Sequence, residues 1–173
     1  MPKSNPTPNP IPEYRLRIET GDAGRAVVFR LYDSQGVLAA DRALTLPDPL
    51  PSLWEGLFDT QRYVELRAGN QIWQDEPHGQ PDTPEAILER LGVFLGREVL
   101  GEEIMTVLTR SRVRRALAVH LPGGDSPLAA ALARAPWEIA RPHPGAKPLM
   151  DTNLVPRLAL VQLRLSSDTT SDR

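Results

Sequence analysis

Apolar and polar residues alternate along the first third of the chain. The apolar members of this alternation are Tyr14, Leu16, Ile18, Val27, Phe29 and Leu31. A period of two residues is typical of a strand with one buried face. Short turns rich in Gly, Asp and Ser separate the runs at 21–24 and 33–36, and a third run follows at 37–46. The pattern therefore predicts an antiparallel three-stranded meander over residues 13–46.

The period lengthens to three and four residues in the middle of the chain. The apolar positions with this spacing are Leu50, Leu53, Trp54, Leu57, Phe58, Ile87, Leu88, Leu91 and Leu95. Such stripes indicate amphipathic helices, and we expect a helical part over residues 47–109. Thr83 suits the N-cap of the second helix, and Pro84 suits its first position. Gly92 and Gly96 either weaken this helix or allow another segment to pack closely against it.

Alternation returns in the last third. It predicts a strand at 117–121, a short alanine-rich helix at 128–135 and a last strand at 158–165, where a change of phase indicates a bulge or a short helix. This strand part spans residues 110–165. We therefore predict a single α/β or α+β domain over residues 13–165.

The two ends of the chain differ in composition from this domain. Residues 1–12 contain five prolines among polar side chains. Proline has no backbone N–H to donate, so this segment is predicted to form a disordered extended arm. Residues 166–173 have no apolar side chain and are predicted to form a disordered tail.

Composition narrows the functional classes. The 173 residues include 20 basic and 22 acidic side chains, a balance that does not favour nucleic acid as a partner. The absence of cysteine excludes a disulfide framework, a thiolate zinc site and a cysteine nucleophile within this sequence. No apolar run approaches the roughly 20 residues of a membrane helix, so no membrane contact is predicted and the cytoplasm is the expected compartment.

Four segments occur in an order that resembles a known family. A Leu-Gly pair with spaced leucines at 91–100 is followed by an amphipathic strand at 115–121. A small-residue helix then leads into Pro136-Trp137-Glu138, and a Leu-Val-Pro-Arg ending follows at 154–157. This order resembles the opening segment of the CHAT domain, a caspase-like peptidase module of clan CD that is widespread in bacteria. The upstream meander is similar to the hairpin region that often precedes that module.

The resemblance implies a front half without the catalytic dyad. In the family, the catalytic histidine follows a later strand and the catalytic cysteine lies further on, and this sequence contains neither position. We therefore expect no catalytic residue and no cofactor. The expected role is that of a non-catalytic accessory or scaffold subunit that binds another protein. A caspase-like catalytic chain is the partner that the resemblance suggests, and bacterial defence is the setting.

The remaining chemistry-bearing residues do not form a recognisable site. His78, His120 and His143 are not spaced as metal ligands, so no metal is predicted. Asp125 and Ser126 lie in a Gly-Asp-Ser-Pro turn that lacks the nucleophile-elbow pattern of serine hydrolases. No small-molecule substrate is predicted either.

Trp137 and Glu138 are the residues that we single out. A tryptophan buries a large area, and its indole N–H needs an acceptor. We expect Trp137 to anchor the short helix to the sheet, and Glu138 to fix a loop or to pair with Arg141 or Arg157. The functional alternative is that this corner docks the catalytic partner, with these residues in contact with it.

The densest basic run consists of Arg110, Arg112, Arg114 and Arg115. It lacks the interleaved aromatic residues of a nucleic-acid site. The run is expected to be the solvated approach to a strand, and the alternative is a charged patch that contacts an acidic partner.

Two rival functions remain open. The first is a stand-alone binding module that recognises a protein or peptide through the edge of its meander. The second is a hydrolase that uses Asp, Glu and Ser in place of cysteine, which would require carboxylates to converge in a pocket.

Overall fold

The structure of the protein is a computed structural model that describes residues 11–21, 25–68, 83–110, 114–121, 127–152 and 154–159. Its strands are β1 (Glu13–Thr20), β2 (Ala26–Tyr32), β3 (Leu38–Thr45), β4 (Arg115–His120) and β5 (Leu154–Ala159). Its helices are α1 (Ser52–Phe58), α2 (Thr60–Ala68), α3 (Pro84–Phe94), the π-helix η1 (Leu95–Leu100), α4 (Gly101–Arg110), α5 (Pro127–Arg134), and the 3₁₀ turns η2 (Trp137–Ile139) and η3 (Leu149–Asp151).

The five strands form one mixed sheet in the order β3-β2-β1-β4-β5. The predicted meander is confirmed, because β1, β2 and β3 are antiparallel neighbours. Strands β4 and β5 continue the sheet in parallel with β1. The α/β fold class is thus confirmed, with an antiparallel half and a parallel half that share β1.

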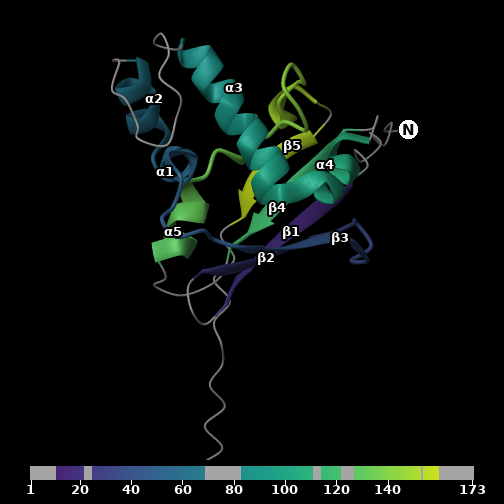
Figure 1. Ribbon diagram of the computed structural model, residues 1–173. Helices are drawn as coiled ribbons and strands as arrows, with labels where there is room; N and C mark the ends of the chain where they lie inside the picture. Colours follow the sequence, from purple (N-terminus) through teal and green to yellow (C-terminus); the bar gives the residue numbers. More distant parts are fainter. Residues whose placement is uncertain are drawn as a thin grey trace, which may run out of the picture.

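The helices of the described part pack against one face of this sheet (Figure 1). The connections β1-to-β4 and β4-to-β5 both step in the same direction across the sheet. Right-handed connections of this kind lie on the same face. The sheet side chains that join the hydrophobic core all come from that face: Tyr14, Leu16, Ile18, Val27, Phe29, Leu31, Ala40, Leu117 and Val119.

The helix layer is joined to the sheet by an aromatic contact. The rings of Phe29 in β2 and Trp137 in η2 meet edge to face with their centroids 6.4 Å apart. Both side chains are almost fully buried. Ile87, Leu91 and Leu95 fill the space above them as the inner stripe of α3 and η1.

Gly92 and Gly96 allow a close approach of two backbones, one of the two roles expected for them. A Cβ at Gly92 would overlap the carbonyl oxygen of Ile139, and a Cβ at Gly96 would lie 2.7 Å from the carbonyl carbon of Arg141. The backbone N–H of Arg141 donates to the carbonyl of Gly92 at 2.8 Å. Any larger residue would separate α3 and η1 from the segment that follows Trp137.

The start of α3 agrees with the sequence prediction. The hydroxyl of Thr83 accepts a hydrogen bond from the backbone N–H of Ala86 at 3.2 Å, and Pro84 occupies the first turn. Helix α2 lies within the predicted helical part 47–109, but the sequence predicts no separate apolar stripe for it. It has little apolar periodicity, and Tyr63 is its one fully buried side chain among the positions described. No helix of the described ranges is both long and apolar enough to cross a membrane.

The last strand differs from the prediction. It spans Leu154–Ala159 and pairs in parallel with β4, whereas the sequence placed a strand at 158–165. Pro156 lies within this strand, at a position that sequence rules treat as a strand breaker. An outer strand tolerates proline because one of its two sides has no neighbour to bond. Residues 160–173, and with them the predicted tail, lie outside the described residues, as does the proline-rich segment 1–10.

Candidate functional site

The face of the sheet opposite the helices is polar and accessible. We call this surface the polar face. Its polar side chains are Arg15, Arg17, Glu19, Arg30, Tyr32, Asp41 and His120, and Val28, Ala116 and Ala118 lie between them. The register places Asp41, Arg30, Arg17 and His120 opposite one another in a row across β3, β2, β1 and β4. Each of these side chains is exposed or half-buried. Alternation along β1 and β2 therefore separates a buried face from an outer one, which is charged along β1 and mixed along β2.

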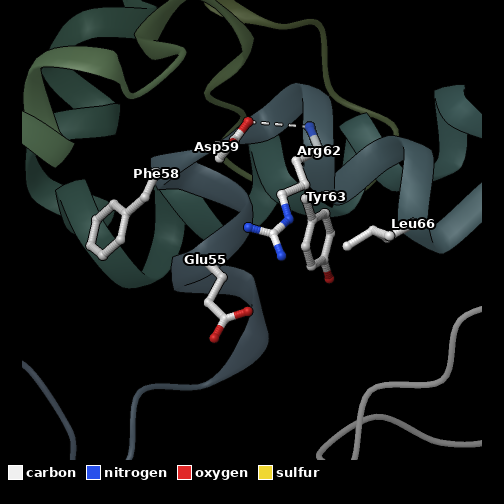
Figure 2. A pocket seen from close by; sticks show the side chains of 6 residues that line it. All are labelled: Glu55, Phe58, Asp59, Arg62, Tyr63 and Leu66. Atoms are coloured by element: carbon white, nitrogen blue, oxygen red, sulfur yellow. Dashed lines mark hydrogen bonds between the residues drawn. The ribbon is translucent and has the colours of Figure 1, made fainter.

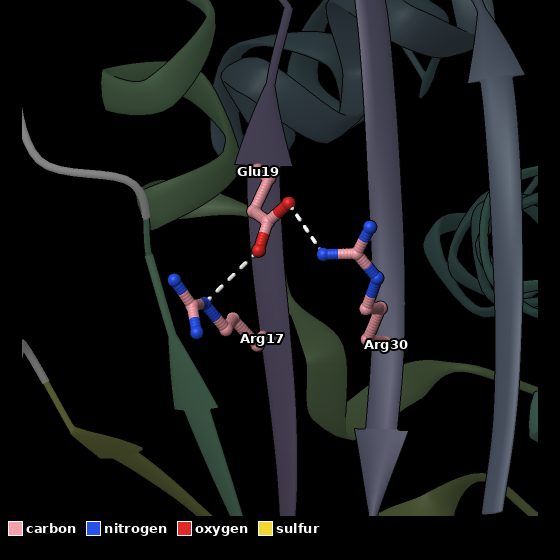
Figure 3. A network of polar contacts seen from close by, with 3 residues as sticks. All are labelled: Arg17, Glu19 and Arg30. Carbon is pink, nitrogen blue, oxygen red and sulfur yellow. Dashed lines mark hydrogen bonds and ion pairs between the residues drawn. The ribbon is translucent and has the colours of Figure 1, made fainter. Parts of the chain in front are cut away.

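An ionic triad lies near the centre of the polar face (Figure 3). One carboxylate oxygen of Glu19 is 3.1 Å from Nε of Arg17, and the other accepts from Nη1 of Arg30 at 2.6 Å. Arg17 and Arg30 are direct cross-strand partners, a pairing of like charges that is unfavourable by itself. Glu19 offsets this repulsion by bridging the two guanidinium groups. The three side chains are 35–51% exposed, so a docking protein can reach them.

Strand β4 is buried on both of its faces, unlike β1. Ala116 and Ala118 lie on the side of the polar face and are 4% and 3% exposed. Their neighbours across the ladder are Glu13 and Arg15 of β1. Strands in parallel sheets that are covered on both sides are typically buried on both faces.

The outer edge of the meander is the other accessible feature of the sheet. Among the described strands, β3 pairs with β2 alone and so has one side without a neighbour. Leu38, its first residue, and Val37, which precedes it, are 48% and 59% exposed. An open strand edge carries unpaired backbone groups that another chain can bond.

Trp137 lies in the core and not on a surface. Its indole Nε1 donates to the carbonyl of Leu132 in α5 at 3.2 Å, while its ring contacts Phe29. The residue thus ties α5 to the sheet, the structural role expected for it. A direct contact with a partner would require the surrounding helix layer to open.

Glu138 and Arg157 are not brought together with Trp137 as one site. Glu138 is exposed on η2, and no ion pair of its side chain occurs within the part of the chain that the structure describes. Arg141, one of its expected partners, donates instead to the carbonyl of Ala146. Arg157 lies in β5 opposite Ala118, at a register position that belongs to the polar face.

The basic run is divided by the fold. Arg110 and Arg114 are exposed at the end of α4 and before β4, and Arg112 lies outside the described residues. Arg115 instead hydrogen-bonds the hydroxyl of Tyr14, with its guanidinium carbon 4.9 Å from the centre of that ring. A side chain at 115 lies on the same face as Leu117 because the strand period is two, so it turns toward the core.

A hollow of about 310 Å³ between α1 and α2 contains two carboxylates (Figure 2). Its lining residues are Glu55, Phe58, Asp59, Arg62, Tyr63 and Leu66. Asp59 accepts from the backbone N–H of Arg62 at 3.2 Å, and Glu55 points away from it at the opposite end of the hollow. Acid–base hydrolysis needs two carboxylates aimed at one bond, and this arrangement does not provide them.

The other candidate residues stay apart. His120 is half-buried on the polar face, and His143 is exposed with Nδ1 2.9 Å from the carbonyl oxygen of Pro144. His78, Asp125 and Ser126 lie outside the described residues. Within the ranges described, no three His, Asp or Glu side chains are grouped to hold a metal ion. No protein-family model matches the chain, and neither a curated protein nor a solved structure matches it.

Proposed function

We propose that the chain is a non-catalytic accessory or scaffold subunit that binds another protein through the polar face. The observation that carries this proposal is the one-sided helix layer. Every helix that contributes to the described core packs on one side of a sheet whose other side has long charged side chains within reach of solvent. The sequence did not predict which surface would be used, because it did not indicate on which face the helices would pack.

The parallel half of the sheet supports this reading. Sheets made only of parallel strands occur almost only with both faces covered, and one half of this mixed sheet is parallel. Here β1, β4 and β5 run parallel, and β4 already has two buried faces. A protein layer seated on the polar face would complete the usual three-layer arrangement, with Arg17, Glu19 and Arg30 as its charged contact.

The identity of the partner rests on the resemblance to the CHAT opening segment. That resemblance favours a chain with a caspase-like His/Cys core, in a bacterial defence system in the cytoplasm. The observed β4-α5-η2 order, with Trp137 buried between the helix layer and the sheet, is compatible with the segments on which the resemblance depends. The partner would supply the catalytic groups, and this chain would supply the surface on which they are held.

The proposal is tested by capture from the native cell with matched baits. The baits are the unaltered chain, a double variant Arg17→Glu/Arg30→Glu, and a control Arg62→Glu/Arg97→Glu with equal charge change on exposed helix positions. We expect the unaltered and control baits to recover a protein with a caspase-like His/Cys core, and the double variant to lose it. Circular dichroism melting establishes that each bait is folded.

Two results would contradict the proposal. Equal recovery by the double variant would show that the polar face is not the contact. Recovery of no such protein by any folded bait would remove the accessory-subunit role itself.

The edge of β3 supports a second candidate function, a stand-alone module that binds an extended peptide. Its open side and the exposed Val37 and Leu38 are the observations in its favour. Binding at a strand edge depends mainly on backbone hydrogen bonds. A partner bound in this way would be retained by the Arg17→Glu/Arg30→Glu bait, so the same experiment distinguishes the two functions.

A further inference from the structure

A groove of about 610 Å³ lies at one end of the sheet, between α5 and the segment that joins β3 to α1. Its lining residues are Arg25, Leu46, Pro47, Asp48, Pro49, Leu50, Phe58, Leu128, Ala131 and Arg134, and we call it the end groove. This volume is within the roughly 300–1,000 Å³ of small-molecule sites. The groove was not predicted from the sequence.

The end groove lies where the parallel strands β1 and β4 finish. Arg25 immediately precedes β2, and the hydrogen bond from the Gly21 N–H to the Ala26 carbonyl, 2.8 Å long, places it beside the end of β1. The Leu46 N–H donates to the Arg25 carbonyl at 2.8 Å and fixes the other wall. Helix α5 follows the end of β4 and supplies Leu128. In open α/β sheets, ligands bind in crevices outside the carboxyl ends of the strands.

The walls of the end groove combine an apolar floor with a rigid rim. Leu46, Leu128 and Ala131 are buried in the floor, while Leu50 is 39% exposed at the rim. Pro47 and Pro49 have fixed φ angles and no backbone donor. The floor therefore favours the apolar part of a ligand and offers it few hydrogen bonds.

The charges around this floor have a net positive sign. Arg25 and Asp48 form an ion pair of 2.6 Å whose side chains are 57% and 64% exposed. Arg134 is exposed at the end of α5, and no ion pair to it occurs among the residues that the structure describes. Two guanidinium groups thus border a site with one carboxylate. An exposed ion pair contributes little stability, so a ligand anion can compete with Asp48 for Arg25.

We propose that the end groove binds a small amphipathic anion, a molecule with an apolar body and one acidic group. The apolar body lies on Leu46, Leu128 and Ala131, and the acidic group contacts Arg134 and Arg25. Asp48 restricts access to Arg25 and so limits affinity. This site lies at the end of the sheet and not on the polar face, and it does not depend on the proposed function.

The proposal is tested by fluorescence titration of the full chain with 8-anilinonaphthalene-1-sulfonate, an apolar aromatic anion. The variants are Arg134→Gln and Asp48→Asn, which change one exposed charge each and in opposite directions. We expect Arg134→Gln to weaken binding about threefold to fivefold, and Asp48→Asn to strengthen it about twofold to threefold, the size of exposed charge contacts. Added salt should reduce both differences.

Matched controls distinguish a specific charge contact from nonspecific binding to apolar surface. Arg62→Gln and Asp41→Asn change exposed charges outside the end groove and should leave the affinity unchanged. Nile red, an uncharged apolar probe, should bind the charge variants equally and should bind Leu50→Ser more weakly. Absence of anion binding by the unaltered chain, or equal anion affinities for Arg134→Gln, Asp48→Asn and the controls, would overturn the proposal. Melting temperatures within a few degrees of the unaltered chain establish that each variant is folded.

Discussion

The two faces of the same strands have opposite chemistry. In β2, Phe29 has no exposed surface, and the adjacent Arg30 side chain is 38% exposed. Phe29 contacts Trp137 under the helix layer, whereas Arg30 reaches Glu19 on the polar face. A shift of one residue exchanges these environments. Stability is therefore expected to depend on one face, and recognition is proposed for the other.

The largest expected effect comes from a pair of adjacent substitutions. Phe29→Ala should lower the free energy of unfolding by about 3–5 kcal/mol, because it leaves a cavity beside Trp137. Arg30→Ala should lower it by less than about 1 kcal/mol, because the lost contact is an accessible ion pair. Urea unfolding of both variants measures the difference. Similar losses of unfolding free energy for Phe29→Ala and Arg30→Ala would indicate that the polar face is covered in the free chain.

The next effect tests the contact within the helix layer. Gly96→Ala places a methyl group against the backbone of Arg141 and should cost about 3 kcal/mol of overpacking. The gain in helix propensity, about 1 kcal/mol, offsets only part of this, so a net loss near 2 kcal/mol is expected. Arg97→Ala changes the adjacent exposed residue and should remain within about 0.5 kcal/mol. A neutral Gly96→Ala in urea unfolding would mean that the two segments separate readily.

A smaller loss is expected at the start of α3. Thr83→Ala removes the hydroxyl that accepts from the Ala86 N–H, and it should lower the free energy of unfolding by about 1 kcal/mol. Thr106→Ala, at an exposed position within α4, is the matched control and should be neutral or slightly stabilising. Thermal unfolding of the Thr83→Ala and Thr106→Ala variants measures this difference. Equal melting temperatures would show that the cap contributes nothing.

The smallest effect belongs to the polar face. Glu19→Gln keeps the shape of the triad but removes the charge that bridges Arg17 and Arg30. We expect a loss of about 0.5 kcal/mol at low ionic strength that disappears near 1 M salt, since exposed pairs are weak and screened. Urea unfolding at two salt concentrations measures it. A loss that persists in high salt would point to a buried network and would contradict the accessible surface described above.

The sequence was most informative where periodicity and capping agree. The alternation from Tyr14 to Leu31 predicted both the meander and its buried side, and Thr83-Pro84 predicted the start of α3. It was least informative where tertiary pairing overrides a local signal. Strand β5 includes Pro156 because it pairs in parallel with β4. Local sequence patterns do not predict this tertiary pairing.

The candidate site was harder to predict than the fold. The four arginines of the basic run are close in sequence and suggest one group, whereas counting by two from Leu117 assigns Arg115 to the side of the core, where it contacts Tyr14. The polar face could be read from the charged positions of β1 and β2, yet its accessibility depends on where the helices pack. The end groove joins residues from three separate segments, so no sequence pattern indicates it.

The contact of Gly92 and Gly96 with residues 139–141 sets a condition on natural variation. In any relatives of this chain, both positions should remain glycine even where the exposed Arg97 differs freely. A relative with a larger residue at either position should also have a changed length or course in the segment after Trp137. The spacing of two glycines four residues apart, followed about 40 residues later by a buried tryptophan, is thus the pattern by which members of this fold should be found.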